Sequence, residues 1–231
     1  MAQPAESSDG SHREAAGRYI LPFAVLIALL AWQNVAPLPT RLDYPLRVLV
    51  LAAVLALYSR PVIRLKPEHL TASLILGAAV FVIWIGPDLL FPRYRLNWLF
   101  QNSLTGTVRS SLPSGLRGDP LVLTFRVLRA VVIVPIVEEL FWRGWLMRWL
   151  IHKDFQDVKF GTYAPLSFWA TALLFASEHG PYWDVGLVAG ILYNWWAIRT
   201  KSLADCILAH AVTNGALCAW VIYSGNWQYW F

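Results

Sequence analysis

Long apolar runs constrain the fold of this chain more than any other feature of its sequence. Each run approaches the roughly 20 residues that an α-helix needs to cross the hydrocarbon core of a bilayer. Seven such runs lie at about residues 19–35, 44–59, 69–91, 127–148, 164–180, 183–199 and 203–223. The irregular stretch 93–126 leaves room for one more. The sequence therefore predicts an all-α, polytopic membrane helical bundle of about seven to eight transmembrane helices.

The composition excludes a soluble enzyme and a disordered chain. Hydrophobic residues make up 57% of the 231 residues and charged residues only 14%, against roughly 25% charged residues in soluble domains. The formal net charge is +5, but the 19 basic residues are spread thinly between the apolar runs. That distribution is typical of the ends of membrane helices, so we expect a lipid bilayer and no nucleic acid as the environment of the chain.

The ends of the runs indicate how the chain is organised. Residues 1–18 are polar and small, and we expect a disordered tail ahead of a single transmembrane domain over residues 19–231. We interpret the run 19–35 as a retained helix, because the segment before it is long and partly acidic for a signal peptide and no small-residue cleavage site follows. The stretch 93–126 mixes arginines with aromatic residues, which favours a position at the membrane interface, in part as a short amphipathic helix.

A GxxxG pattern formed by Gly186 and Gly190 lies within one predicted span. Small residues at this spacing let two helices approach closely. We expect them to serve tight packing inside the bundle rather than a dimer seam, and the sequence indicates no oligomeric state.

Three charged residues lie close together inside one apolar run, namely Glu138, Glu139 and Arg143. Each unpaired charge at the bilayer centre costs about 2.5–3.5 kcal/mol, so these groups must be paired, near an interface or in a wet cavity. Glu139 and Arg143 have the i, i+4 spacing of a helical ion pair. Glu138 points about 100° away from Glu139 on the same helix, which leaves it without a partner and makes it a candidate functional carboxylate.

Two later spans carry groups that complement this carboxylate. His179 follows Phe175 by four residues, and His210 and Asn214 share one face of the last span. A carboxylate beside a neutral imidazole can activate water, and a histidine with an amide can stabilise an oxyanion. These are the parts of a peptide-bond hydrolase. The alternative is that the histidines and the amide form hydrogen bonds between helices.

Two further polar residues have structural interpretations. Glu178, next to His179, either fixes the tautomer of that imidazole or lies at the membrane interface. Asn194 lies within a span, where we expect it to serve packing rather than chemistry.

Three ordered motifs resemble those of the CAAX prenyl protease and bacteriocin-processing (CPBP or ABI) family of intramembrane proteases, which includes the Ras-converting enzyme. The residues are EELFWR (138–143), FASEH (175–179) and HAVTN (210–214), and the resemblance covers about residues 119–224. It implies a helical membrane fold with a protease-like core. By motif position, Glu138 resembles the catalytic base and His179 its partner. His210 and Asn214 resemble the oxyanion-stabilising pair, and the resemblance gives Glu139, Arg143 and Phe175 supporting roles.

The resemblance leaves the cofactor open. Glu138, His179 and His210 would offer zinc two histidines and one carboxylate, with a fourth position for water. HExxH is absent and Asn214 is a poor ligand for first-row metals, so a metal-free glutamate mechanism is favoured.

The sequence as a whole predicts an intramembrane endopeptidase. Its partner would be a membrane-associated peptide or protein, prenylated at a CaaX tail if the source has prenyltransferases, and its location a prokaryotic inner membrane. The alternative is a non-catalytic membrane scaffold or bacteriocin-immunity-type protein with the same fold. A transporter ranks last, because no paired half-repeats of broken helices are present.

Overall fold

The computed structural model describes residues 5–230 and contains no β-strand within them. Helices account for 75% of the structure, which confirms the all-α fold class. The helices are α1 (Ala5–Val35), α2 (Thr40–Val54), α3 (Leu70–Leu90), α4 (Pro120–Leu128), α5 (Val134–Glu139), α6 (Met147–Trp149), α7 (Pro165–Ser177), α8 (Trp183–Thr200) and α9 (Leu203–Ser224). Wider, π-helical turns at 129–133 and 140–146 join α4, α5 and α6 into one continuous rod, and another at 55–59 extends α2.

Five helical segments in the described part of the chain are long and apolar enough to cross a membrane. They are Glu14–Gln33, Thr40–Val62, Leu70–Leu90, Pro120–Trp149 and Leu203–Ser224. The two remaining apolar runs also form helices, but α7 has only 13 residues and α8 is not among the five. All seven predicted runs are thus helical, while the count of seven to eight spanning helices is not established.

Two segments differ from the expectation drawn from the sequence. Helix α1 begins at Ala5, so residues 5–18 continue the first span as helix where we expected disorder, and residues 1–4 lie outside the described part. The Glu14–Arg18 ion pair of 3.0 Å, at i, i+4 spacing, stabilises this extension.

The fourth span also starts earlier than the sequence indicates, at Pro120 rather than 127. The Asp119 side chain caps this helix by accepting the N–H groups of Leu121 and Val122 at 3.0 and 3.2 Å. The N–H of Val122 and the Arg41 guanidinium hold the pKa of the Asp119 carboxyl below its usual value. The segment before it, 91–119, is irregular with two short 3₁₀ turns and contains no amphipathic helix.

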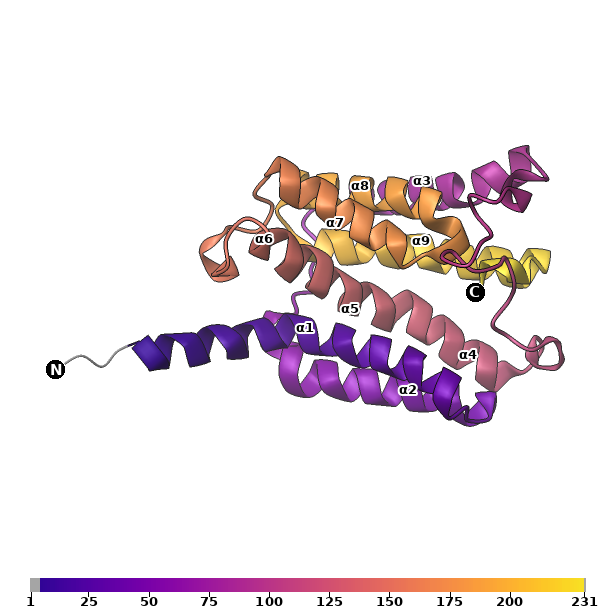
Figure 1. Ribbon diagram of the computed structural model, residues 1–231, viewed down its shortest axis with the longest axis horizontal. Coiled ribbons are helices and arrows are strands. Elements are labelled where there is room, and N and C mark those ends of the chain that lie inside the picture. The colour runs from indigo at the N-terminus through magenta and orange to yellow at the C-terminus, as the bar shows by residue number, and fades with distance from the viewer. Residues whose placement is uncertain (1–4, 231) are drawn as a thin grey trace.

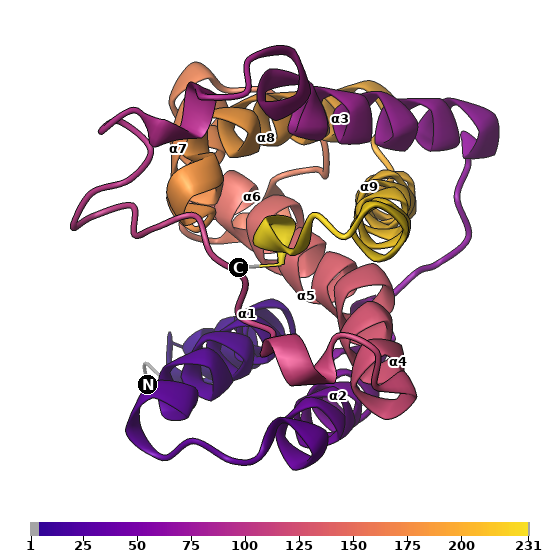
Figure 2. The same cartoon turned by 90° about the vertical axis from the view of Figure 1, so that its right-hand side faces the viewer.

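The rod formed by α4, α5 and α6 runs through the middle of the molecule and separates two groups of helices (Figure 1). Helices α1 and α2 lie on one side of it, and α3, α7, α8 and α9 lie on the other (Figure 2). Glu138, the carboxylate predicted to be functional, is on this central rod, so residues from both groups of helices can face it.

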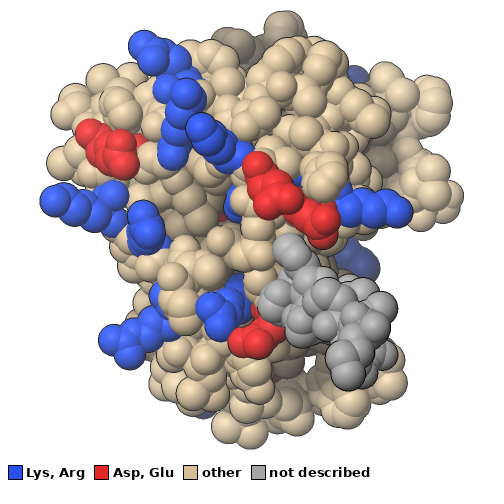
Figure 3. Space-filling model, turned by 90° about the vertical axis from the view of Figure 1, so that its left-hand side faces the viewer, with Lys and Arg blue, Asp and Glu red and all other residues tan. Residues whose placement is uncertain are grey.

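Basic side chains are distributed over the end of the bundle at which α1 starts. Figure 3 shows Lys and Arg spread over this face, with fewer Asp and Glu among them. The links from α2 to α3, from α6 to α7 and from α8 to α9 lie at the same end (Figure 1). An excess of Lys and Arg at one end of a helical bundle is typical of one surface of a membrane protein.

The GxxxG pair of α8 packs against α7, as predicted. A Cβ added at Gly190 would lie 3.2 Å from the carbonyl oxygen of Ala172, and one added at Gly186 would lie 3.1 Å from the ring of His179. The two glycines therefore let the α7–α8 hairpin close tightly and leave room for the imidazole of His179.

Candidate active site

A buried ion pair on the central rod forms the base of the site. The Arg143 guanidinium donates to Glu139 Oε1 at 3.0 Å, and both side chains are fully buried. Arg143 also donates to the side-chain oxygen of Asn194 on α8 at 3.0 Å and lies 4.6 Å above the ring of Phe175 on α7. The predicted i, i+4 pair is confirmed, and it ties the rod to the α7–α8 hairpin. Asn194 has the packing role expected of it.

His210 on α9 is oriented by the same carboxylate. Its Nδ1 lies 2.9 Å from Glu139 Oε1. A carboxylate only accepts hydrogen bonds, so Nδ1 carries the proton and Nε2 of the neutral ring has a free lone pair. The ring stacks on Tyr193 with centroids 5.2 Å apart, and Nε2 faces Glu138 Oε2 at 4.0 Å. Glu139 therefore connects the supporting ion pair to an imidazole that points at the neighbouring glutamate.

Glu138 differs from Glu139 in its surroundings. The Oε2 atoms of both carboxylates are buried and have no hydrogen-bond partner in the described part of the molecule. Glu139, however, accepts two hydrogen bonds at Oε1, whereas the Glu138 side chain lines a cavity of about 390 Å³. Since buried polar atoms in proteins are nearly always satisfied, an unpartnered carboxylate oxygen in a cavity indicates a site for water or a ligand.

His179 ends α7 with a fixed tautomer. Its Nδ1 donates to the carbonyl oxygen of Phe175 at 2.7 Å, so its Nε2 also has a free lone pair. Trp84 of α3 packs edge-on against the ring with centroids 5.2 Å apart. The tautomer is therefore fixed by the Phe175 carbonyl and not by Glu178, which is exposed at the cavity rim.

Asn214 is positioned by a defect in the central rod. In the π-helical turn before α5, the N–H of Val134 bonds to the carbonyl of Arg129, five residues back. The carbonyl of Ala130 would accept from residue 135 in the same pattern, but residue 135 is proline and has no N–H. The Asn214 amide donates to this carbonyl instead, at 2.8 Å. One N–H of the amide is used in this way, and the second remains.

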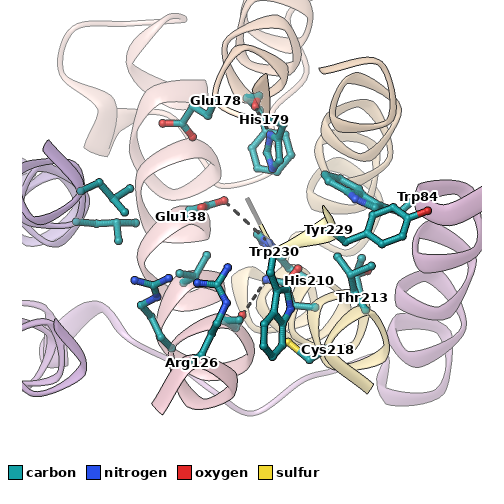
Figure 4. Close-up of a pocket in the computed structure, with 18 of the residues that line it drawn as sticks. Trp84, Arg126, Glu138, Glu178, His179, His210, Thr213, Cys218, Tyr229 and Trp230 are labelled. Atoms are coloured by element: carbon teal, nitrogen blue, oxygen red, sulfur yellow. Dashed lines mark hydrogen bonds and ion pairs between the residues drawn. The ribbon is translucent and has the colours of Figure 1, made fainter. Parts of the chain in front are cut away.

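The structure brings Glu138, His179, His210 and Asn214 to one cavity, together with Phe175. Glu138 and His210 face each other, and His179 lies beside them at the end of α7 (Figure 4). Glu139 and Arg143 lie behind the cavity wall. Helix α1 contributes one apolar part of the wall, through Phe23, Leu26, Ile27 and Leu30.

Several cavity residues were not singled out by the sequence analysis. Tyr193 donates to Thr213 Oγ1 at 2.7 Å, and Thr213 bonds in turn to the Gly77 carbonyl at 2.9 Å, which fixes the ring that stacks on His210. Arg126 and Arg129 line the opposite end of the cavity. Two arginines at i, i+3 inside an apolar segment can indicate a functional site. The sequence analysis did not detect this pair, because it started the fourth span at residue 127 and so assigned Arg126 to the preceding loop.

Glu138, His179 and His210 carry donor atoms of the types that bind zinc. In the structure these atoms are too far apart to coordinate one ion. His179 and His210 both present Nε2, and their Nδ1–H groups donate to a carbonyl and a carboxylate, as the histidine ligands of zinc do. In the part of the chain that the structure describes, only His152, Asp154 and Asp157 bring three donor atoms within 4.8 Å of one another, and these are exposed. Glu138, His179 and His210 would have to move closer to share an ion.

The sequence of this region matches one known family. Residues 120–216 match the family model described as type II CAAX prenyl endopeptidase Rce1-like. This segment, 97 of the 231 residues, is similar to the CAAX protease family. All four cavity residues Glu138, His179, His210 and Asn214 lie inside the matched segment. The match and the five long apolar helices of the described residues together indicate an integral membrane protein. Comparison with curated proteins and with solved structures found no match.

Proposed function

We propose that the protein is an intramembrane endopeptidase that hydrolyses a peptide bond in a membrane-associated substrate. The carrying observation is Glu138, whose Oε2 has no hydrogen-bond partner in the described residues and lies 4.0 Å from Nε2 of His210 in the cavity. A buried carboxylate oxygen without a partner in a cavity can be satisfied by a water molecule. The match of residues 120–216 to the type II CAAX prenyl endopeptidase family model supports the same reaction class.

In the proposed reaction, Glu138 takes a proton from water while the water oxygen adds to the carbonyl carbon of the substrate. Nε2 of His179, which has a free lone pair, accepts the second water hydrogen and orients the nucleophile. The second N–H of Asn214 donates to the oxyanion that forms. The C–N bond then breaks as Glu138 returns its proton to the leaving nitrogen, which yields a carboxylic acid and an amine.

The role of His210 in this reaction depends on whether its Nε2 carries a proton. Its neutral ring has no proton on Nε2, because Nδ1 donates to Glu139. It can donate to an oxyanion only when Nε2 carries a proton. We assign His210 to oxyanion stabilisation in that form, with Glu139 at 2.9 Å as the group that positions the ring.

The cavity also indicates the physical class of the substrate. One wall is the apolar face of α1, including Phe23, Leu26 and Leu30, and the helices around it are long and apolar. A peptide anchored in the bilayer by a lipid or an apolar segment would enter such a cavity with its anchor against α1. A prenylated CaaX-type tail fits this description, as do other membrane-anchored peptides of a prokaryotic inner membrane.

The test uses purified protein in phosphatidylcholine vesicles and a dye-labelled peptide that ends in an S-farnesylated CaaX sequence. We expect one defined C-terminal fragment by mass spectrometry. If folded protein releases no fragment, the peptides of the native host are compared between the wild type and Glu138→Gln at matched protein levels. Identical peptide profiles, with the cellular phenotype intact in the variant, would replace the protease with a non-catalytic scaffold.

We expect hydrolysis to be independent of zinc. A zinc ion held by Glu138, His179 and His210 would acidify its bound water, but those donors do not form a closed set in the structure. Treatment with a strong chelator is expected to change kcat by less than about twofold, and metal analysis of active protein should give far less than one zinc per chain. Stoichiometric zinc that is lost together with activity would contradict the metal-free mechanism.

We expect a methyl group at Gly186 to impair hydrolysis by displacing His179. The new Cβ would lie 3.1 Å from Cβ, Cγ and Nδ1 of that imidazole, which must then shift by a few tenths of an ångström. Misplacement of a catalytic group by about 1 Å can cost about 10²-fold, so Gly186→Ala should lower kcat by about tenfold. Gly86→Ala is the matched control, since a Cβ there meets nothing within 4 Å. Equal kcat values for the two variants would contradict the assignment of His179.

A further inference from the structure

Two arginines face the catalytic cavity, and neither forms an ion pair with a carboxylate in the described part of the chain. The Arg126 side chain lies on α4, is 6% exposed and donates to the Tyr44 hydroxyl at 2.9 Å. Arg129, in the following turn, has a buried Nη1 with no hydrogen-bond partner in the described residues. Both line the same cavity as Glu138, and Figure 4 places Arg126 at the opposite end of that cavity from Glu178 and His179.

The neighbouring charges neutralise this pair only in part. Asp43 attracts Arg129 electrostatically, but its ion pair is with Arg47 of α2, at 2.9 Å. No Asp or Glu whose side chain is described forms an ion pair with Arg126 or Arg129. Aromatic rings take the place of anions, since Arg126 lies 4.9 Å from the Trp230 ring and Arg129 lies 5.3 Å from the Tyr44 ring. Two cations inside a membrane span are costly unless they meet an anion, so the arrangement is suited to binding one from the cavity.

The spacing between the arginines and Glu138 limits what the anion can be. Arg129 precedes Glu138 by nine residues along a continuous helical rod, which corresponds to about 13 Å at 1.5 Å per residue. An extended peptide spans the same length with about four residues at 3.3–3.6 Å each. A peptide bond held at Glu138 would therefore place a group three or four residues downstream near the guanidinium groups.

We propose that Arg126 and Arg129 form a binding site for the free C-terminal carboxylate of the peptide substrate. This inference rests on the proposed function. A guanidinium offers paired N–H donors that match the two oxygens of a carboxylate, and Arg129 has an unused donor for it. The site fixes the distance between the scissile bond and the chain end, and so restricts hydrolysis to bonds near a C-terminus. Arg126 and Arg129 are specificity residues and take no part in the bond-breaking step.

The experiment compares two farnesylated peptides that differ only in a C-terminal carboxylate or a C-terminal amide, with purified protein in phosphatidylcholine vesicles. The wild type is expected to cleave the carboxylate peptide with a kcat/KM about 10- to 100-fold higher, the range for one charged hydrogen-bonded contact. Arg129→Gln should remove this preference by slowing cleavage of the carboxylate peptide alone. Arg109→Gln removes the same charge from an exposed position in the 91–119 segment and should preserve the preference.

Each other outcome overturns the assignment. Equal cleavage of both peptides by the wild type would show that the carboxylate is not recognised. A variant slowed equally on both peptides would give Arg129 a structural role. A preference lost to the same degree in Arg109→Gln would reflect net charge. If phosphatidylglycerol in the vesicles stimulates the wild type and not Arg129→Gln, while the two peptides are cleaved alike, the anion is a lipid phosphate. Failure of the proposed function is distinct from all of these, because the wild type would then cleave neither peptide.

Discussion

Replacement of Glu138 by glutamine is expected to lower kcat for peptide hydrolysis by about 10²–10⁴-fold, the contribution of a general base. Glutamine has nearly the same shape but cannot take a proton from water. The protein should remain folded, because Oε2 of Glu138 makes no hydrogen bond in the described residues that the amide would break. Desolvating an amide also costs less than desolvating a carboxylate, so we expect an unchanged or slightly higher Tm. Peptide cleavage and thermal unfolding of the same preparation provide the two measurements.

Glu178→Gln is the matched control for this experiment. Glu178 lines the same cavity and carries the same charge, but it is exposed. We expect its kcat to stay within about threefold of the wild type. A comparable loss in both variants would mean that the negative charge of the cavity, and not the position of Glu138, supports the reaction. Retention of wild-type activity by Glu138→Gln would remove the proposed base and with it the mechanism.

The different surroundings of Glu138 and Glu139 could be predicted from the sequence because the two residues are adjacent on one helix. Helix geometry sends the two carboxylates in directions about 100° apart, and Arg143 can reach only one of them. The structure gives Glu139 the ion pair with Arg143 and leaves Glu138 in the cavity. The convergence of His179, His210 and Asn214 on that cavity was predicted from the residue types and from the family resemblance, and the fold brings all three there.

Other features of the site depend on contacts that a single sequence does not display. The tautomer of His179 follows from the Phe175 carbonyl at the end of α7, which becomes accessible only because the helix ends there. The position of Asn214 follows from a π-helical turn whose carbonyl is left free by Pro135. Helical periodicity assumes a regular rod, so it could not anticipate this irregular turn.

The boundaries of helices limited the prediction in two further places. Residues 5–18 continue α1, since a polar segment joined to a long helix needs no nucleation of its own. The fourth span begins at Pro120 with Asp119 as its N-cap. The sequence analysis missed this cap because it took the start of the apolar run, residue 127, as the start of the helix. The second shift matters for function, because it moves Arg126 from a loop into the cavity wall.

Replacement of Glu139 by glutamine is expected to destabilise the protein by about 3–5 kcal/mol, the cost of breaking a buried ion pair on one side. Glu139 has 0% exposed surface and accepts from both Arg143 at 3.0 Å and His210 at 2.9 Å. Loss of its charge leaves the Arg143 guanidinium buried without a counter-ion. Arg143→Met should destabilise by a similar amount for the converse reason. Unfolding titrations in mixed detergent micelles measure both, with Glu138→Gln as the isosteric control on the same turn.

The double variant Glu139→Gln, Arg143→Met separates charge pairing from packing. Removing both charges leaves no buried ion unpaired, and buried pairs replaced together by neutral groups are often close to neutral in stability. We therefore expect the double variant to be more stable than either single variant, with a coupling of about 0.5–3 kcal/mol, as for contacting residues. It should still hydrolyse peptide more slowly than the wild type, because His210 loses the carboxylate that positions its ring. Additive destabilisation in the double variant would show that the two side chains act through packing with Phe175 and Asn194 rather than through their ion pair.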